Sequence, residues 1–353
     1  MPGTKAAETV TNKPAGGLPP DGAPPEASRR PTVTSREVAA AAGVSQSAVS
    51  LVFSGKWRGR VSTETADRIR ECARELKYRP NLVARGLRTE QTGTVLAVLP
   101  ELTIASFGDL HAGISAEAQQ AGYSVVIASA PSAIQNSALP VPGYLVDGVL
   151  IVRDAVGVID SLAHLPAVGI DTDPRSLPVT VNSDVAAGMQ AACRMLLARG
   201  HRRIGYLQAG PPGSWLLSTK HDAAGRALPP GTAELVVCPT SLELPKARLA
   251  ARELLGAAGR PTAVICEDDN IAIAVYIECS ALGLRIPEDV SVVGHDDLPI
   301  AEALHPALTT ATVPAAGLGA QAMHSLLALL RGEPAASRQL PVTLTERESV
   351  RTV

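Results

Sequence analysis

Residues 34–53 read TSREVAAAAGVSQSAVSLVF. The pattern predicts two short helices, the first capped by Thr34 or Ser35 and the second by Ser45, because these side chains can accept a hydrogen bond from a first-turn N–H. Gly43 between them can adopt the positive φ of a tight turn, and the small Ala39 lets the helices cross closely. This spacing is typical of a helix-turn-helix, whose second helix lies in the major groove of DNA.

A third helix and an excess of positive charge follow this motif. Ser62 can cap a helix with apolar residues at helical spacing, and Pro80 ends the region. Residues 29–91 contain 13 Lys/Arg and 6 Asp/Glu, a net charge of +7, whereas the whole chain carries −2. A basic segment on an acidic body favours contact with a polyanion. The alternative is a solvated helical surface, since Arg-rich helix faces are common.

Length and composition limit the class of protein. The chain has 353 residues, of which 46% are hydrophobic, 19% charged and 3% aromatic. At about 100–200 residues per domain, this length predicts two or three domains. The few aromatics argue against folds that stack single-stranded nucleic acid on aromatic side chains. Residues 1–31 are rich in Pro, Gly and Ala, with almost no large apolar side chains, so we expect a disordered tail.

The cysteines and the apolar runs indicate a reducing, cytoplasmic compartment. Five cysteines, an odd number without any CxxC pair, disfavour a disulfide scaffold and a cysteine-based zinc site; they stand at positions 72, 193, 238, 266 and 279. No apolar run reaches the ~18–20 residues that cross a bilayer. The first residues lack the apolar stretch of a signal peptide.

From residue 92 onward, strand-like apolar runs alternate with amphipathic helices. The expected strands are 94–100, 124–130, 147–152, 166–171, 202–209, 233–238, 262–268 and 289–297. The expected helices are 108–121, 185–199, 245–258 and 270–282. Short apolar runs separated by helices indicate parallel sheets covered on both faces, and about 260 residues of this pattern favour two lobes.

The body carries no motif of a known catalytic class. It has no GxxxxGK[ST] or GxGxxG phosphate loop, no GxSxG elbow and no HExxH zinc motif. Two acidic rows, EDD at 267–269 and HDD at 295–297, follow strong strands at the sheet edge where open α/β folds bind ligands. Their carboxylates could accept hydrogen bonds from a polyol or act as catalytic acids. The alternative for the first row is capping of the helix expected at 270–282.

The motifs together resemble the LacI/GalR family of bacterial repressors. EVAAAAGVSQSAVSLVFSG and VSTETADRIRECARELKYRPNLVARGLRTEQTG resemble its headpiece and hinge. The body repeats the family's order with HAGISAEAQQAGY, DGVLIV, PAVGID, LLARGHRRIGYL, RIPEDVSVVGHDD, HPALTT and LTERESV. The resemblance covers residues 32–353. It implies an N-terminal all-α helix-turn-helix headpiece plus hinge helix, then a two-lobed periplasmic-binding-protein-like doubly wound α/β core.

The resemblance implies the following domains. A tail at 1–31 precedes the headpiece at 32–80 and the hinge helix or linker at 81–91, and the effector-binding and dimerisation core spans 92–353. Within the core, the N-lobe is expected at about 92–181 and 310–332, and the C-lobe at about 182–309 and 333–353.

The resemblance also implies the contacts to DNA. Gln46 and Ser47 would read base edges, and Leu51 would pack on a thymine methyl, unless it belongs to the headpiece core. Trp57 could pack on the DNA sugar edge or on the headpiece, and we favour the headpiece. The other implied contacts, to phosphates or the groove, are Thr34, Ser45, Ala48, Ser50, Lys56, Arg58 and Arg60.

In the family, the hinge folds into a helix on DNA, and its leucine wedges into the minor groove. That leucine is Leu87 here, with Asn81 at the start of the hinge helix, Ala84 on its paired face and Arg88 nearby. Gly86 is a departure from the family pattern, because glycine lowers the stability of a helix by about 1 kcal/mol relative to Ala. The hinge should therefore depend more strongly on DNA and on dimer contacts.

The implied ligand contacts are less uniform. Asp269, Asp296 and Phe107 are the expected contacts in the cleft between the lobes, where a ligand would change the angle between them. Asp222 joins this set, although the family often has Arg there, three residues before the Gly that is Gly225 here. A ligand other than a sugar, or a degenerate pocket, therefore stays open.

The expected function is sequence-specific transcriptional regulation. The chain should repress a catabolic or transport operon, bind a palindromic double-stranded operator as a homodimer, and respond to a small-molecule effector, a sugar or a related metabolite. We expect no cofactor, no metal, no enzymatic activity and no membrane partner, and a cytoplasmic protein that joins the nucleoid when DNA-bound. One alternative is a periplasmic sugar-binding protein, which predicts a signal peptide and no headpiece. Another is a sugar-processing enzyme, which needs a catalytic constellation.

Overall fold

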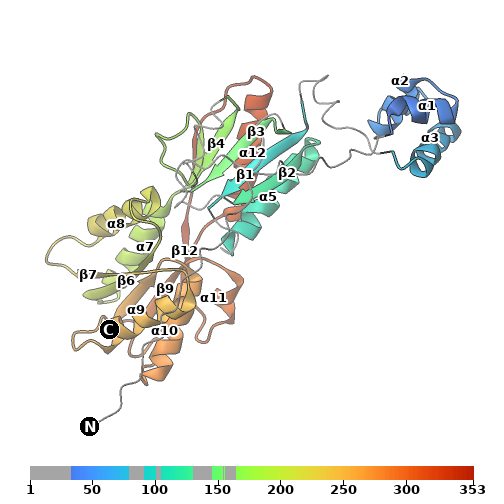
Figure 1. The fold of residues 1–353 in the computed structure, drawn as a ribbon. Helices are drawn as coiled ribbons and strands as arrows, with labels where there is room; N and C mark the ends of the chain where they lie inside the picture. The colour runs from blue at the N-terminus through green and yellow to red at the C-terminus, as the bar shows by residue number, and fades with distance from the viewer. Residues whose placement is uncertain (1–32, 79–90, 101–104, 130–144, 154, 156–163) are drawn as a thin grey trace, which may run out of the picture. The chain divides into compact units, whose positions relative to one another are not determined.

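The computed structural model describes residues 33–78, 91–100, 105–129, 145–153, 155 and 164–353 (Figure 1). The chain divides into two compact units, 1–81 and 82–353. The tail predicted at 1–31 lies outside the described residues, and so do the hinge residues Asn81, Ala84, Gly86, Leu87 and Arg88.

The described part of the first unit, residues 33–78, contains three helices, α1 (Ser35–Ala42), α2 (Gln46–Phe53) and α3 (Thr63–Glu75). Thr34 and Glu37 cap α1 reciprocally, because each side chain accepts a hydrogen bond from the other residue's backbone N–H. Gly43 ends α1 at φ 64°, in the left-handed region that the turn requires.

A small apolar core joins the three helices. Val38 from α1, Val49 from α2 and Ile69 from α3 are fully buried in it. Arg68 of α3 donates a hydrogen bond from Nε to the Ala42 carbonyl at 3.1 Å, which satisfies an acceptor at the end of α1. The predicted helix-turn-helix and its third helix are thus present.

The second unit contains two six-stranded sheets, one in each lobe. The N-lobe sheet is parallel throughout, with the order β11-β5-β4-β3-β1-β2. Its strands are β1 (Thr94–Leu99), β2 (Ser124–Ser129), β3 (Gly148–Val152), β4 (Ala167–Ile170), β5 (Thr180–Ser183) and β11 (Arg338–Leu340). Strands β1, β3, β4 and β5 form the interior of this sheet, and the first three have the continuous apolar sequences that predict such a position.

The C-lobe sheet has the order β12-β10-β9-β8-β6-β7 and is parallel except where β10 meets β12. Its strands are β6 (Arg203–Ala209), β7 (Glu234–Thr240), β8 (Ala263–Cys266), β9 (Ser291–Asp296), β10 (Thr309–Thr312) and β12 (Thr343–Thr345). The helices of this lobe are α7 (Val185–Ala198), α8 (Trp215–Ala227), α9 (Leu244–Gly256), α10 (Asp269–Ala281) and α11 (Pro299–Ala303). Separate apolar clusters form where α7 and α8, and where α9 and α10, pack on the sheet.

Two helices of the N-lobe, α5 (Ser106–Gln120) and α12 (Ala315–Leu330), pack on each other and on the sheet. Glycines permit their close approach: a Cβ on Gly113 would lie 1.9 Å from the Ala316 carbonyl oxygen, and one on Gly319 would lie 2.1 Å from that of Leu110. Because both obstacles are backbone atoms, neither glycine can be enlarged without moving a helix. This packing fixes the position of the α5 N-terminus.

The lobe boundaries differ from the sequence estimate. Strand β10, expected in the N-lobe, pairs with β9 in the C-lobe, and β11, expected in the C-lobe, pairs with β5 in the N-lobe. The chain therefore crosses between the sheets after β5, after β10 and after β11. These strands are only three or four residues long, so their apolar pattern does not identify their sheet. None of the helices in the described ranges is long and apolar enough to span a membrane.

Candidate functional site

One face of α2 in the first unit is polar and open to solvent. Gln46, Ser47 and Ser50 are exposed, whereas Val49 and Val52 on the opposite side are buried in the core. This division follows from the helical repeat, which places positions three and four apart on the same face. The exposed face offers hydroxyl and amide groups, which are the groups that read base edges in a major groove.

The side chains around this face are held locally. Ser45 caps α2 by accepting a hydrogen bond from the Ala48 N–H at 3.2 Å. Gln46 donates from Nε2 to the Ser35 hydroxyl at 2.8 Å, which orients its amide before any DNA is bound. Leu51 is half-buried, and in the described unit it is not one of the apolar residues packed against the core. This placement favours the groove contact over the core alternative for Leu51.

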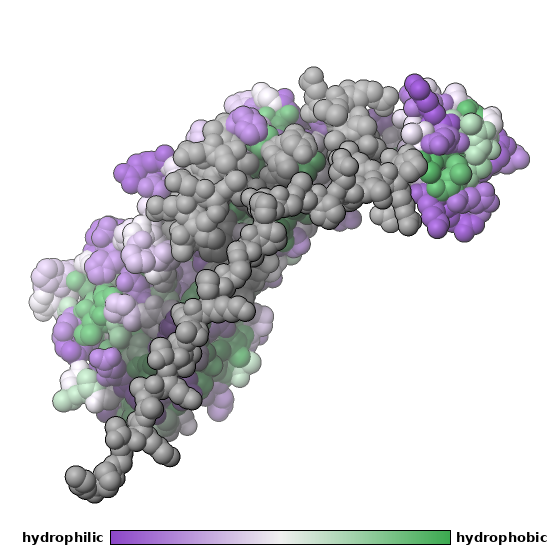
Figure 2. All heavy atoms as spheres, in the orientation of Figure 1, coloured by the Kyte–Doolittle hydropathy of each residue, from purple (hydrophilic) through white to green (hydrophobic). Residues whose placement is uncertain are grey.

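The loop between α2 and α3 carries positive charge without acidic partners. Among the described residues, none of its cations makes an ion pair; these are Lys56, Arg58 and Arg60, all exposed. The charges of α3, in contrast, pair within the helix, as Asp67 and Arg70 do at 2.6 Å. Trp57 packs on the core under the Arg70 guanidinium, 5.1 Å from the ring centroid, as the headpiece interpretation predicts. Figure 2 shows hydrophilic side chains around a small apolar area on the visible face of this unit.

A pocket in the second unit is lined by both lobes. Ser106 and Phe107 reach it from the N-terminus of α5, Arg153 and Asp171 from the ends of β3 and β4, and Asp296 from the end of β9 in the other lobe. All three strands present their carboxyl ends, the edge at which open α/β sheets bind ligands. Two of the predicted ligand contacts, Phe107 and Asp296, thus line the same pocket.

Backbone strain is concentrated around this pocket. Arg153 and Asp171 have φ 51°, Asp296 has φ 101° and Asp297 has φ 60°, all outside the normal range for non-glycine residues. Each such residue costs about 1–3 kcal/mol and persists only where its surroundings hold it. Such strain is common at binding sites, because it fixes side chains in positions that regular strands cannot supply.

Asp296 is buried but charged. Its carboxylate lies 2.9 Å from His295 Nδ1. Burial alone would raise the pKa of Asp296, but the hydrogen bond from His295 and the positive charges of Arg153 and Lys220 outweigh it, so the pKa lies below its usual value. The pocket therefore presents an ionised acceptor to hydroxyl groups at neutral pH.

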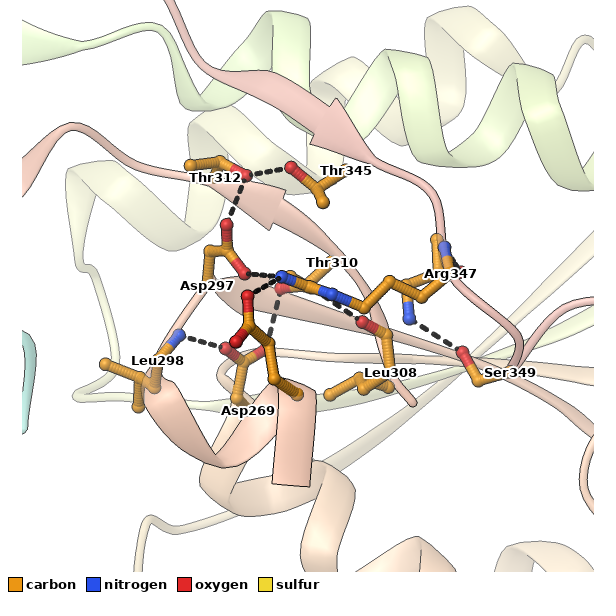
Figure 3. A network of polar contacts seen from close by, with 11 residues as sticks. Asp269, Asp297, Leu298, Leu308, Thr310, Thr312, Thr345, Arg347 and Ser349 are labelled. Carbon is orange, nitrogen blue, oxygen red and sulfur yellow. Dashed lines mark hydrogen bonds and ion pairs between the residues drawn. The ribbon is translucent and has the colours of Figure 1, made fainter. Parts of the chain in front are cut away.

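Asp269 has a different role from the predicted ligand contact (Figure 3). It is fully buried, and its two oxygens accept hydrogen bonds from the Leu298 N–H and the Thr310 hydroxyl, each at 2.7 Å. Burial raises its pKa to about 7. Asp269 therefore holds the turn that follows β9 and does not line the pocket. Gly294 makes room for it, since a Cβ there would lie 2.0 Å from Asp269 Oδ1.

Asp297 completes the support of the same turn. It accepts hydrogen bonds from Arg347 Nη2 at 2.8 Å and from the Thr312 hydroxyl at 2.9 Å (Figure 3). Arg347 belongs to the C-terminal LTERESV segment, and it also donates to the Leu308 carbonyl at 2.9 Å. Asp269 and Asp297 thus hold the turn from which Asp296 reaches the pocket.

The three acids of the EDD row at 267–269 have different roles, of which that of Asp269 is described above. Glu267 forms a buried ion pair with Lys220 at 2.5 Å and accepts a hydrogen bond from the Tyr206 hydroxyl. Asp268 caps α10 by accepting from the Ile271 N–H at 2.8 Å, as the capping alternative proposed. No member of this row lines the pocket in the described residues.

The remaining predicted residue, Asp222, is exposed on α8 and is not part of the described pocket lining. Sequence reasoning missed Ser106, Arg153 and Asp171. Arg153 directly follows the strand predicted at 147–152, and Asp171 is the last residue of the strand predicted at 166–171, so the rule applied to the 295–297 row would have found both. Within the described ranges, no group of three or more His, Cys, Asp or Glu side chains could hold a metal ion.

Two family models match the chain. Residues 34–81 match the model described as bacterial regulatory proteins, lacI family, and residues 193–350 match the periplasmic binding protein-like domain. Among curated proteins, a ribose operon repressor of Haemophilus influenzae is 29% identical over 333 residues, covering 90% of this chain and 98% of the repressor. The HTH-type transcriptional repressor PurR of Vibrio atlanticus is 28% identical and covers 91% of this chain and 99% of its own.

Solved structures of transcriptional regulators are also similar to the chain over most of its length. A lac repressor dimer bound to operator and the anti-inducer ONPF superposes with a TM-score of 0.76 and 25% identity, over 91% of this chain and 99% of that one. A complex of the transcriptional regulator CelR with cellobiose has a TM-score of 0.64 and 28% identity, over 90% of this chain and 99% of that one.

Proposed function

The chain belongs to the LacI family of bacterial transcriptional regulators, and from this premise we propose that it represses a catabolic or transport operon as a homodimer on a palindromic operator. It is a DNA-binding regulator with a metabolite-binding domain and not an enzyme. We further propose that it works in the bacterial cytoplasm and associates with the nucleoid when DNA-bound.

One observation carries the proposal: a single chain holds both a polar, exposed recognition helix and a strained pocket between two lobes. On α2, Gln46 and Ser47 would read base edges, while Lys56, Arg58 and Arg60 would position the unit on phosphates. The hinge would add Leu87 as a minor-groove wedge, an assignment that rests on the family resemblance alone.

Effector control would act through the angle between the lobes. The pocket takes Asp296 from one lobe and Phe107 from the other, so a ligand that touches both favours one lobe arrangement. A ligand changes DNA affinity only if it binds the two arrangements differently. We propose a sugar or a related metabolite, because an ionised carboxylate and an aromatic ring are suited to a polyhydroxylated molecule.

The first experiment is a selection of operator DNA. Purified protein is mixed with sheared DNA from its own source at near-physiological salt, and the retained fragments are sequenced. A shared palindrome with a pyrimidine–purine centre supports a dimeric repressor, and the neighbouring genes then suggest effectors. Retention without a shared sequence, lost as salt rises, reflects only backbone electrostatics and contradicts the proposal.

A further inference from the structure

The α5 N-terminus faces the effector pocket without a side-chain cap. The helix begins at Ser106 after Ala105, and no side-chain cap hydrogen bond is made there within the described residues. Ser106, Phe107 and Leu110 from its first turns line the pocket. The N-terminus of a helix of this length carries a partial positive charge and N–H groups that favour an anion. Asp109 in the same turn is exposed and is not part of the described pocket lining.

The Ser106 hydroxyl is a second, independent feature of this wall. Ser106 is 6% exposed, and among the described residues its Oγ has no hydrogen-bond partner. A buried hydroxyl without a partner is unfavourable, because it has lost its hydrogen bonds to water. Since Ser106 lines the pocket, a bound ligand is the partner that can satisfy it.

Arg153 brings a full positive charge to the same wall. Its guanidinium carbon lies 5.1 Å from the centroid of the Phe107 ring, and its backbone N–H donates to the Ile170 carbonyl at 2.8 Å. Within the described part of the chain, the guanidinium makes no ion pair or hydrogen bond. A planar group with five N–H donors matches a carboxylate or a phosphate.

The acidic residues in the pocket serve a different part of a ligand. Asp171 already accepts two hydrogen bonds at one oxygen, from the Ser183 N–H at 2.6 Å and from the Ser183 hydroxyl at 2.7 Å. Asp296 comes from the other lobe; it is paired with His295, and the positive charge of Arg153 also lowers its pKa. A ligand that satisfies the whole pocket therefore carries hydroxyl groups toward Asp296 and an anionic group toward Ser106 and Arg153.

We propose that Ser106, Arg153 and the first turn of α5 form an anion subsite of the pocket, and that the effector is a polyhydroxylated metabolite with a carboxylate or a phosphate. This proposal rests on the proposed function of the pocket. It names the ligand as a sugar acid or a sugar phosphate instead of a neutral sugar. The departure at Asp222, where the family often has Arg, agrees with a cation supplied from the other lobe.

Simple anions test the subsite without knowledge of the effector. The full-length protein is titrated with inorganic phosphate and, separately, with acetate at constant ionic strength, and binding is followed by calorimetry and by the shift in Tm. Both probes are expected to bind the wild type, and the tighter one indicates whether the natural group is a phosphate or a carboxylate. Arg153→Gln should weaken the binding about tenfold or more, because it removes charge-assisted hydrogen bonds. Ser106→Ala should weaken it less while leaving the protein at least as stable without anion.

The matched control is Arg175→Gln, which removes an exposed arginine that is paired with Asp173 outside the pocket. It should bind both anions like the wild type. Equal anion binding by wild type and Arg153→Gln, or no binding by the wild type, would overturn the subsite. Operator binding is measured on the same samples. If the wild type binds its operator specifically but does not bind the anions, the subsite alone is rejected. If the wild type shows no specific operator binding, the proposed function is rejected.

Discussion

The exposed polar face of α2, formed by Gln46, Ser47 and Ser50 and called the reading face below, differs from the pocket of the second unit in how its polar groups are presented. On α2, the recognition groups are exposed, uncharged and carried by a regular helix, so nothing around them must be strained. In the pocket, most of the groups are buried or half-buried and several are charged, and the three turns that carry or adjoin them contain four non-glycine residues with positive φ. The comparison teaches that substitutions on α2 should change binding without changing stability. Substitutions around the pocket should change both.

The largest expected effect is at the buried ion pair between Lys220 and Glu267 in the C-lobe. Lys220 is 2% exposed and Glu267 is 8% exposed, so Lys220→Met leaves a buried carboxylate without its cation. We expect a loss of about 3–5 kcal/mol in the free energy of unfolding, measured by urea denaturation. The double variant Lys220→Met/Glu267→Gln should recover part of that loss. If the single variant is as stable as the wild type, the stability of the C-lobe does not depend on this buried ion pair, and the comparison fails.

The next effect concerns the packing of α5 against α12, which positions the proposed anion subsite. Gly113→Ala places a methyl group against the Ala316 carbonyl, so α5 and α12 must separate. We expect a loss of about 1–3 kcal/mol in stability. Gly225→Ala on α8 is the matched control, because nothing lies within 4 Å of the added Cβ, and it should stabilise that helix by up to about 1 kcal/mol. Similar results for the two variants would show that the close approach of the helices is unimportant.

On the reading face, Gln46→Ala should behave in the opposite way. It removes a base-edge donor and acceptor, and we expect about 1–3 kcal/mol less discrimination at one base pair of each half-site. Its stability should stay within about 0.5 kcal/mol of the wild type, because the side chain is exposed. Ser35→Ala, which frees the Gln46 amide, should broaden preference at the same base pair by a smaller amount. Selection from randomised operators measures both, and unchanged preference in Gln46→Ala contradicts its base-reading role.

Two opposing dependences of stability on pH form the last test of the comparison. Burial lowers the pKa of His201 below 6.5, so the unfolded chain binds a proton more readily and stability falls as pH drops below that value. Asp269 has a pKa of about 7 in the folded protein and 3.8 as its ordinary value, so its contribution falls as pH rises between them. His201→Gln should remove the first slope and Asp269→Asn the second, as thermal melts from pH 4 to 8 would show. If the pH dependence assigned to His201 or Asp269 persists in the variant of that residue, the assignment is wrong.

The two regions also differ in how far the sequence predicted them. For α2, the caps, the turn glycine and the exposed face follow from residues within twenty positions, and Ser45, Gln46 and Ser47 lie where the pattern placed them. For the pocket, the predicted residues Phe107 and Asp296 line it, whereas Asp269 lies outside the lining. Adjacent carboxylates after one strand cannot be told apart by sequence, because the neighbouring element that each one meets decides its role.

The sequence alone determined the helix-turn-helix, the alternation of strands and helices, and the family. Those features depend on local signals: capping side chains, apolar periods and motifs in a fixed order. Only the tertiary structure decided which short strands belong to which sheet, that Asp297 is held by Arg347, and that Ser106 and Arg153 line one pocket. The reason is physical: burial and ion pairing are set by groups that are distant in sequence, whereas helix caps and apolar periods are set by near neighbours.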